Sequence, residues 1–382
     1  MHKLKPKKML GRNVYEETLD RIRKIYDQFD KVVVSFSGGK DSTAVLNMAL
    51  IIAKERGALP LEVLFFDEEA IPPPTIDYME RVKNLPEINL HWYCLEFEHR
   101  NACSNEEPFW YTWDRDKEDL WVRPLPEGVI TTHEKFKKGI SFQEFSDNIY
   151  NPNDGRIAVL TGIRTQESLR RFRIIASRAD ENYINSRLKH NVAKCHPIYD
   201  WHSNDVWLAV HKFGWDYNTT YDVYNMTRQH GQYNKQRLCP PFGEEPLRGL
   251  YVYAECFPEM WEKMLNRVPG VNTAWRYANT ELYSSAKTKP GNLNWRQYSE
   301  VVLASYPPEI RKEVINQMHK YVKVHYSKTT DPIPEEEANI VSGVSWKFIC
   351  SVAIRGDFKD RMHSKLISEA CNTERKYKKN NK

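Results

Sequence analysis

The sequence predicts an α/β fold in which helices flank a parallel sheet. Short apolar runs that suit strands alternate along the chain with segments whose apolar residues recur at helical spacing. The run at residues 61–66 is apolar apart from Glu62 and closes on an aspartate, as expected of a strand covered on both faces. The 382 residues are 41% hydrophobic and 12% aromatic, which is enough for a large core. Alternating strands and helices form right-handed βαβ units, so a ligand is expected at the carboxyl ends of the strands.

The first half of the chain contains most of these elements. A helix at residues 14–30 leads into a strand at 31–36, and a glycine-containing turn follows. Three prolines at 72–74 break the chain before another short helix. The remaining predicted elements are a helix at 43–56 that stops at Gly57, a helix at about 75–83, and strands at 61–66, 90–97 and 157–161.

The second half contains longer connections and more helix. Residues 98–155, rich in tryptophan and charge, exceed a normal connection and suggest an inserted subdomain or lid. A helix should begin near Ser203 and end at Gly214. From about residue 247 the pattern is mostly helical, with a solvated loop at 332–337. We expect three parts: a basic tail and helix at 1–30, a nucleotide-binding domain at 31–246, and a helical region with a basic tail at 247–382.

Several classes of protein are disfavoured by composition. No run of 18 apolar residues is present, and the basic N-terminus lacks a following apolar stretch, so we expect neither a membrane contact nor a secretory signal. The sequence therefore predicts a soluble cytoplasmic protein. Seven cysteines without a CxxC pair fit reduced thiols better than disulfides or a zinc ribbon.

The positive charge is unevenly distributed. The formal net charge is +5, but residues 1–12 and 371–382 together carry +9, so the 358 residues between them carry −4. The basic excess therefore lies in the two tails. The interpretation that assigns them no function is that they are solvated termini. Within the body, residues 164–194 form the densest basic cluster, with eight lysines or arginines against three acids.

One segment carries the clearest chemical signal, VVVSFSGGKDST at residues 32–43. It joins a buried strand to a helix, where unsatisfied N–H groups and the helix dipole favour an anion. Gly38 and Gly39 allow a tight turn, and Lys40 supplies positive charge for phosphates. Ser37 and Ser42 can donate hydroxyl hydrogen bonds.

Other interpretations of this segment exist. Asp41 is a candidate to hold Mg²⁺ through water, or it only caps the helix. The bland interpretation of the whole segment is a turn whose polar residues cap the helix. The spacing is neither GxxxxGK[ST] nor a dinucleotide fingerprint.

The segment SGGKDS resembles the pyrophosphate-binding PP-loop of the ATP pyrophosphatase superfamily, whose members split ATP between the α and β phosphates. LTGIRTQESLRR, residues 160–171, resembles a segment of phosphoadenylyl-sulfate (PAPS) reductases that contacts the anionic groups of the nucleotide. The resemblance implies an adenine nucleotide α-hydrolase-like fold, with ATP or a related adenine nucleotide and Mg²⁺ as ligands. The resemblance implies that Gly162 permits a close approach of the backbone at the strand end, and that arginines supply bidentate contacts to phosphate.

The resemblance selects a set of site residues. Lys40, Asp41 and Arg164 form the expected catalytic set, and Asp41 is also the candidate metal ligand. Residues expected to contact the nucleotide are Ser35, Phe36, Ser37, Gly38, Gly39, Lys40, Asp41, Ser42, Thr43, Asp67, Gly162, Arg164, Arg170 and Arg171. Asp67 is similar to a position near the ribose, base or metal, although a turn aspartate is a rival interpretation. Further basic and acidic residues are assigned to solvated or capping roles: Arg173, Arg178, Arg187, Asp200 and Asp205.

The pattern of PAPS reductases is incomplete here. Their C-terminal ECGLH segment, which provides a nucleophilic cysteine, is absent, and Cys371 has different neighbours. Paired cysteines that would hold an iron–sulfur cluster are also absent, so no such cluster is expected. Sulfate reduction is therefore disfavoured.

The residues QRLCPPFGEEP at 236–246, the insertion and the helical C-terminal region resemble phage- and plasmid-borne relatives typified by immunoglobulin-binding regulator A, a co-activator of prophage genes. That resemblance implies a ParB-like protein partner and a setting in gene control or phage–host conflict.

Two functional hypotheses follow. In the first, the protein is an ATP pyrophosphatase or adenylyl transferase that works mainly by electrostatic stabilisation. In the second, it is a nucleotide-responsive co-activator without turnover, with its basic tails as candidates for contact with nucleic acid. Sulfur transfer to nucleic acid, as in thiolating relatives of the superfamily, is a third and weaker hypothesis.

Overall fold

The structure is a computed structural model, and it describes residues 11–104, 106–168, 191–226, 250–277 and 291–356. Shorter described stretches are 171–172, 175, 181, 183–185, 238, 241–243, 362 and 366. Several residues considered above lie outside the described ones: Arg170, Arg173, Arg178, Arg187, Cys239, Cys371, most of 236–246, the C-terminal tail, and all of the N-terminal tail except residues 11 and 12.

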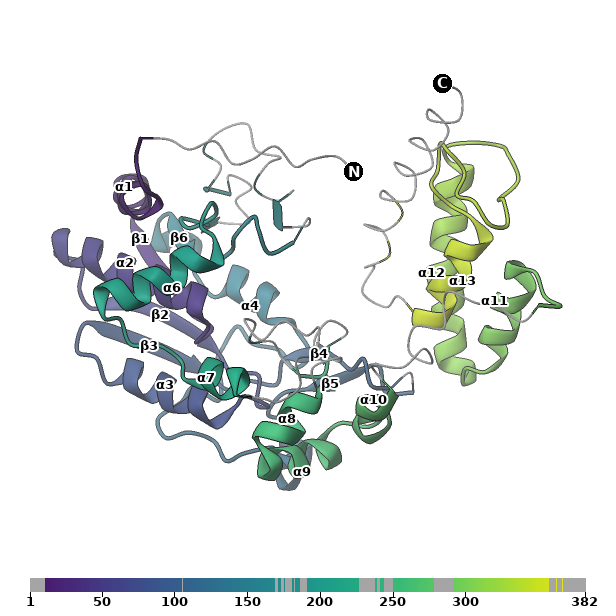
Figure 1. Cartoon of the computed structure of the whole chain (residues 1–382), viewed down its shortest axis with the longest axis horizontal. Coiled ribbons are helices and arrows are strands. Elements are labelled where there is room, and N and C mark those ends of the chain that lie inside the picture. The colour runs from purple at the N-terminus through teal and green to yellow at the C-terminus, as the bar shows by residue number, and fades with distance from the viewer. Residues whose placement is uncertain are drawn as a thin grey trace. The chain divides into compact units, whose positions relative to one another are not determined.

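The main sheet has five parallel strands in the order β3-β2-β1-β6-β7 (Figure 1). The strands are β1 (Lys31–Ser35), β2 (Leu61–Phe66), β3 (Ile88–Tyr93), β6 (Ile157–Leu160) and β7 (Val192–Cys195). Val34 of β1 lies between Val63 and Leu160 in register. The chain therefore proceeds outward from β1 on one side and from β6 on the other, which opens a crevice at their carboxyl ends. The predicted α/β fold with a parallel sheet is confirmed.

Four helices pack with the sheet around one large apolar cluster. They are α1 (Val14–Gln28), α2 (Lys40–Glu55), α3 (Pro73–Lys83) and α6 (Ser203–Phe213). α2 is buried along most of its length, with Val45, Ala49 and Ile52 fully inaccessible. This burial explains why its apolar residues recur on more than one face.

The predicted helix ends are observed in the structure. Gly57 and Gly214 have positive φ values of 64° and 63°, and the Gly214 N–H closes α6. Asp205 accepts a hydrogen bond from the N–H of His202, and Asp200 pairs with Arg21 of α1. Both aspartates therefore have structural contacts, as their sequence positions suggested.

Two predicted elements, the helix at 43–56 and the strand at 90–97, had wrong boundaries. α2 begins at Lys40 rather than residue 43, because Gly39 is already extended and serves as its N-cap. The strand predicted at 90–97 is β3, Ile88–Tyr93. It ends early because the Cys94 N–H donates to Ile130 O and the Phe97 N–H donates to Leu95 O, which takes the chain out of the sheet.

Much of the insertion packs against the second face of the sheet. An apolar cluster joins Phe97 and Phe145 to the strand residues Val33, Leu64 and Val159. The insertion contains β4 (Glu98–Arg100) and β5 (Phe109–Tyr111), which form a two-stranded sheet, together with η1 (Arg115–Leu120), α4 (Phe142–Asn148) and η2 (Pro152–Asp154).

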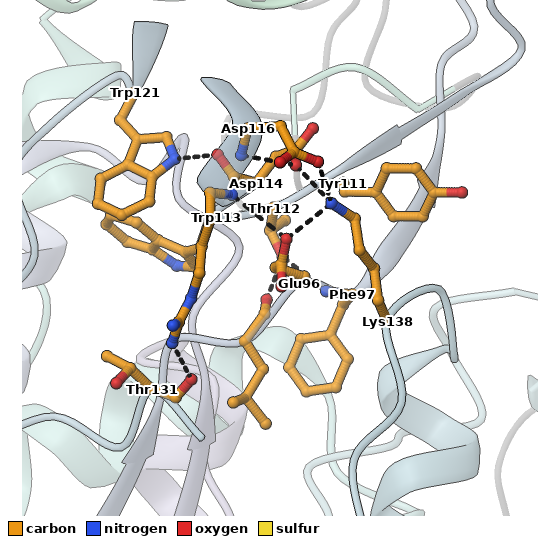
Figure 2. Close-up of polar contacts among 12 residues, drawn as sticks. Glu96, Phe97, Tyr111, Thr112, Trp113, Asp114, Asp116, Trp121, Thr131 and Lys138 are labelled. Atoms are coloured by element: carbon orange, nitrogen blue, oxygen red, sulfur yellow. Dashed lines mark hydrogen bonds and ion pairs between the residues drawn. The ribbon is translucent and has the colours of Figure 1, made fainter. Parts of the chain in front are cut away.

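A single lysine joins three parts of this region (Figure 2). Lys138 Nζ lies 2.7 Å from an oxygen of Asp114, 3.0 Å from Asp116 and 2.8 Å from Glu96. These carboxylates, Asp114 and Glu96 first, raise the pKa of Lys138. Trp121 Nε1 donates to the backbone carbonyl of Asp114, so η1 is fastened at the same point.

Contacts among Cα atoms divide the described residues into two compact units. The first comprises the chain up to His99, Tyr111–Pro241 and Tyr251–Arg267. The second comprises Arg100–Trp110, Phe242–Leu250 and the chain from Val268 onward. The first unit thus contains the sheet, α7 (Thr220–Asn225), most of α8 (Leu250–Cys256) and α9 (Pro258–Arg267).

The second unit is mostly helical, as predicted. It contains α10 (Val271–Tyr277), α11 (Trp295–Ala304), α12 (Pro308–Tyr326) and α13 (Trp346–Arg355). Its core includes Tyr321 and Phe348, whose rings meet edge to face at 5.1 Å. Among the residues with described positions, no helix is both long and apolar enough to cross a membrane.

The Lys138 cluster predicts a specific acid dependence of stability. Burial alone would raise the pKa of Asp114, but the hydrogen bond and the charge of Lys138 outweigh it, and the pKa lies below its usual value. Such a carboxylate stabilises the fold above its unfolded-state pKa, near ~3.9, and this contribution is lost as pH falls through the folded-state value. We expect the melting temperature to fall more between pH 6 and pH 3 in wild type than in Asp114→Asn, as measured by circular dichroism. The exposed Asp77→Asn variant is the control and should follow wild type, whereas parallel curves for Asp114→Asn and wild type would contradict this account.

Candidate functional site

The glycine turn between β1 and α2 lies at the crevice in the sheet. Gly38 has a φ of 68°, which disfavours any side chain, and a Cβ there would lie 3.2 Å from Thr75 Cγ2. Gly39 then begins α2 in an extended conformation. The N–H groups of Gly38, Gly39 and Asp41 make no hydrogen bond to the described part of the chain. The turn therefore offers backbone donors at a helix N-terminus, the arrangement that suits an anion.

Three charged side chains meet beside this turn. Lys40 Nζ donates to Oδ2 of Asp41 at 2.8 Å, and Arg164 Nε donates to Oδ1 of the same carboxylate at 2.7 Å. Lys40 is 3% exposed and Arg164 is 4% exposed. Arg164 Nη1 also donates to the carbonyl of Trp201 at 3.3 Å. The three residues predicted as the catalytic set therefore form one connected group, in which Lys40 and Arg164 are buried and Asp41 is partly buried.

Gly162 allows this meeting of two strand ends. A Cβ on Gly162 would lie 2.8 Å from both the carbonyl carbon of Asp41 and the nitrogen of Ser42. Both are backbone atoms at the start of α2, so they cannot rotate away as a side chain would. The close approach expected of Gly162 is thus an approach to α2, which places Arg164, two residues later, against Asp41.

Of the other residues predicted to contact the nucleotide from this loop, some are buried in the core and others form the turn itself. Phe36 and Thr43 are buried; Phe36 packs edge to face on Tyr78, and Thr43 Oγ1 is 2.9 Å from the Tyr78 hydroxyl. Ser42 Oγ donates to the carbonyl of Gly39 and lies 3.1 Å from Ser37 Oγ. The serines therefore close the turn, and Ser35 is the last residue of β1.

Arg171 is brought to the same charged group through one carboxylate. It forms an ion pair with Glu167, which lies 3.6 Å from Arg164 Nη2. Lys40, Arg164 and Arg171 are therefore three cations against the two carboxylates Asp41 and Glu167. Cations of low exposure, such as Lys40 and Arg164, attract an anion strongly, because the surroundings screen them little.

Residues from α7 and the segment before it support the turn and were missed from the sequence. Asn218 is fully buried, and its Nδ2 donates to Gly38 O at 2.9 Å and lies 2.8 Å from Thr75 Oγ1. The Tyr221 hydroxyl accepts the N–H of Lys40 at 3.0 Å. No local pattern marks these residues, which lie about 180 positions from their partners. The one available signal was the short polar turn around Asn218.

Asp67 is fully buried at the end of β2 and is already engaged. Its carboxylate accepts hydrogen bonds from Trp92 Nε1, from the N–H of Glu69 and from Arg123. Burial, together with the charge of Asp67, raises the pKa of the neighbouring Cys94 thiol. These contacts favour the interpretation of Asp67 as a structural turn aspartate over a direct contact with a ribose or a metal.

Glu69, two residues further along, forms a second buried ion pair that the sequence did not suggest. Glu69 has a positive φ of 62°, and its carboxylate accepts from Arg267 Nε at 2.6 Å and Arg267 Nη2 at 2.9 Å. The N–H groups of Trp113 and Val122 donate to the same carboxylate. Four donors thus hold a residue in an uncommon backbone conformation.

Whether these residues can hold Mg²⁺ depends on Asp41, the predicted metal ligand. Within the part of the chain that the structure describes, no three His, Cys, Asp or Glu side chains are grouped to hold a metal ion. Both oxygens of Asp41 already accept from cations. Because Mg²⁺ is commonly bound by one or two carboxylates together with substrate phosphates, Asp41 fits this role only if a nucleotide draws Lys40 or Arg164 away.

Two family models match consecutive parts of the chain. The model described as phosphoadenosine phosphosulfate reductase domain matches residues 31–224, slightly more than half of the 382 residues. A model described as a domain of unknown function (DUF3440) matches residues 231–362. A protein of Escherichia coli (strain K12), named uncharacterized protein YbdN, is 30% identical over 386 residues, with 95% of this chain and 93% of that protein covered.

Solved structures with a similar fold were also found. PAPS reductase from Candida auris, in a phosphate complex, has a TM-score of 0.33 at 16% identity over 57% of this chain and 93% of that one. FMN adenylyltransferase from Candida glabrata, with FMN and an ATP analogue, has a TM-score of 0.34 at 11% identity over 56% and 64% of the two chains. Scores this low assign neither an activity nor a ligand.

Gly162 gives a direct test of the geometry. In Gly162→Ala the new methyl must displace the first turn of α2, so we expect a loss of about 1–3 kcal/mol of unfolding free energy, as for other overpacked sites. We also expect weaker binding of pyrophosphate, because Arg164 moves away from Asp41. Urea unfolding and calorimetric titration measure the two effects. Gly291→Ala, at a glycine with no atom within 4 Å of the added Cβ, is the matched control, and equal behaviour of the two variants would contradict the close approach.

Proposed function

Because the chain belongs to the phosphoadenosine phosphosulfate reductase domain family, we propose that it binds ATP or a related adenine nucleotide and cleaves it between the α and β phosphates. The turn between β1 and α2 receives the β and γ phosphates in this proposal. The observation that carries it is the buried group in which Asp41 holds Lys40 and Arg164 beside the N-terminus of α2.

The chemistry is mainly electrostatic. Attack of an acceptor oxygen on the α phosphorus forms one P–O bond, breaks the bond to the bridging oxygen and releases pyrophosphate, while the proton of the acceptor passes to solvent. Negative charge grows on the departing pyrophosphate. Lys40 and Arg164 stabilise this charge, and their positions are already fixed by Asp41, so little reorganisation is needed.

Mg²⁺ belongs to the proposal as an ion that arrives with the nucleotide. When bound, it would neutralise phosphate charge. Asp41 is the residue of this chain that would hold it, once the phosphates take over the hydrogen bonds of Lys40 or Arg164.

The proposal extends to partners. The resemblance of residues 236–246 and of the C-terminal region to regulator-type relatives supports a ParB-like protein partner. We also propose that the activity serves gene control or phage–host conflict, with the basic tails as candidate contacts for nucleic acid. The assay for turnover is therefore run with and without such a partner.

The direct test uses ATP labelled at the α phosphorus. Purified protein is incubated with this ATP and Mg²⁺, and the products are separated by chromatography. AMP with pyrophosphate, or a labelled acceptor, is the expected outcome. Release of ADP and phosphate, or no product under any condition, would contradict cleavage at the α phosphorus.

Lys40→Ala should weaken nucleotide binding. The variant removes a buried cation, so we expect the Kd for pyrophosphate to rise roughly 10- to 100-fold, the range for losing a hydrogen bond to a charged group. Calorimetric titration gives the Kd. Lys54→Ala is the matched control, since it removes the same charge from the exposed end of α2.

The Lys40→Ala variant also separates an enzyme from a regulator. Lost turnover in a variant whose nucleotide binding is weakened but still measurable indicates a catalytic role, whereas a biological output that survives without nucleotide binding indicates a scaffold. An unchanged Kd for pyrophosphate would overturn the assignment of the turn as the phosphate site.

Asp41→Asn should have two opposite effects. The variant removes negative charge between Lys40 and Arg164, so we expect pyrophosphate without Mg²⁺ to bind about three- to tenfold more tightly. Turnover that depends on Mg²⁺ should fall if Asp41 holds the ion. Titration without metal and the labelled-ATP assay with metal measure the two effects, and weaker binding without metal would show that Asp41 mainly positions the cations.

A further inference from the structure

A pocket of about 400 Å³ lies in the first compact unit beside the end of β2. Ile71 lines it from the connection between β2 and α3, Pro73 lines it from the first position of α3, and Val122 and Arg123 line it from the insertion. The opposite wall comes from the end of α8 and the first two turns of α9, residues 256–263. No role in nucleotide binding is assigned to these residues above.

The lining has the chemistry of a small-molecule site. Most of the side chains are apolar or weakly polar: Ile71, Pro73, Val122, Cys256, Phe257, Pro258 and Met260. Pockets of this volume and character take ligands the size of one or two fused rings. The Phe257 side chain, only partly buried, offers an aromatic surface to such a ring.

Charge at the pocket favours an anion. Arg123 and Lys263 are the cations among the lining residues and Glu259 is the carboxylate, while Arg123 is also ion-paired with the buried Asp67. Arg123 is held in place because Nη2 donates to Asp67 and Nε donates to the carbonyl of Glu69 at 3.0 Å. Its Nη1 makes no hydrogen bond with any residue described in the structure, so the guanidinium keeps a donor for a ligand.

The pocket and the glycine turn between β1 and α2 both contact residues at the start of α3. Pro73 lines the pocket. Two residues later, Thr75 hydrogen-bonds Asn218 and lies against Gly38, where a Cβ would come within 3.2 Å. The pocket and the glycine turn thus contact residues that are two positions apart at the start of α3.

The lining residues of the pocket come from both of the segments that the two family models match. Ile71, Pro73, Val122 and Arg123 fall in the segment matched by the first model, whereas residues 256–263 fall in the segment matched by the second. The Glu69–Arg267 ion pair joins the two segments beside the pocket. The pocket thus needs both segments, as expected of a site that gives this combination of domains its own substrate.

We propose that this pocket holds the acceptor in the reaction, a small molecule with a planar apolar ring and an anionic group. The inference rests on the proposed function, because an acceptor is needed only if the nucleotide is cleaved. The ring packs against Phe257 and Met260, and the anionic group faces Arg123 and Lys263.

The test uses 1-anilino-8-naphthalenesulfonate, which combines fused rings with a sulfonate and becomes fluorescent in apolar sites. Wild type should bind it saturably. Met260→Trp fills the pocket and should abolish the signal, whereas Met226→Trp, at a methionine that is 79% exposed, should not. Lys263→Glu, on the surface of α9, should raise the Kd about five- to tenfold without affecting folding. Lys54→Glu is its control.

Competition separates this inference from the proposed function. ATP should not displace the probe, and Lys40→Ala should bind the probe as wild type does. Displacement by ATP would overturn the inference, since the pocket would then belong to the nucleotide. Fluorescence unchanged in both Met260→Trp and Lys263→Glu would overturn it too. If the probe binds as expected but labelled ATP gives no product, the proposed function and the acceptor role fail together.

Discussion

The arrangement of the site depends on one carboxylate, Asp41, that bridges two buried cations from different parts of the chain. Lys40 comes from the start of α2 after β1, and Arg164 comes from the segment after β6. Two like charges this close and this little exposed would repel one another without Asp41 between them. The bridge requires the two strand ends to touch, and the missing side chain at Gly162 makes that contact possible.

Buried carboxylates also hold cations at the end of the neighbouring strand, β2. Asp67 and Glu69 follow β2 and hold Arg123 and Arg267, so two buried carboxylates fasten the insertion and α9 to the segment after β2. Each of these pairs has additional hydrogen bonds from backbone or tryptophan N–H groups. A buried ion pair needs hydrogen bonds to its remaining polar atoms, and these carboxylates have them. The fixed ion pairs explain how the pocket beside β2 keeps its shape.

Sequence reasoning predicted the sheet and the glycine turn after β1 because both depend on local signals. Apolar strands and the run SGGKDS are visible within a few residues, and Gly162 and Arg164 sit at a strand end where a ligand is expected. Asn218, Tyr221 and the Glu69–Arg267 pair were not predictable in this way, because their partners are 143 to 198 positions distant. The sequence also did not show that Phe36 and Thr43 face the core, since the motif lists residue types without their directions.

The most direct test of the central claim is a crystal structure with a non-hydrolysable ATP analogue and Mg²⁺. The account predicts that the β phosphate lies against the N–H groups of Gly38 and Gly39. It also predicts that Lys40 or Arg164 exchanges its hydrogen bond to Asp41 for one to a phosphate oxygen. An analogue bound elsewhere, with the Lys40–Asp41–Arg164 bridge unchanged, would contradict it.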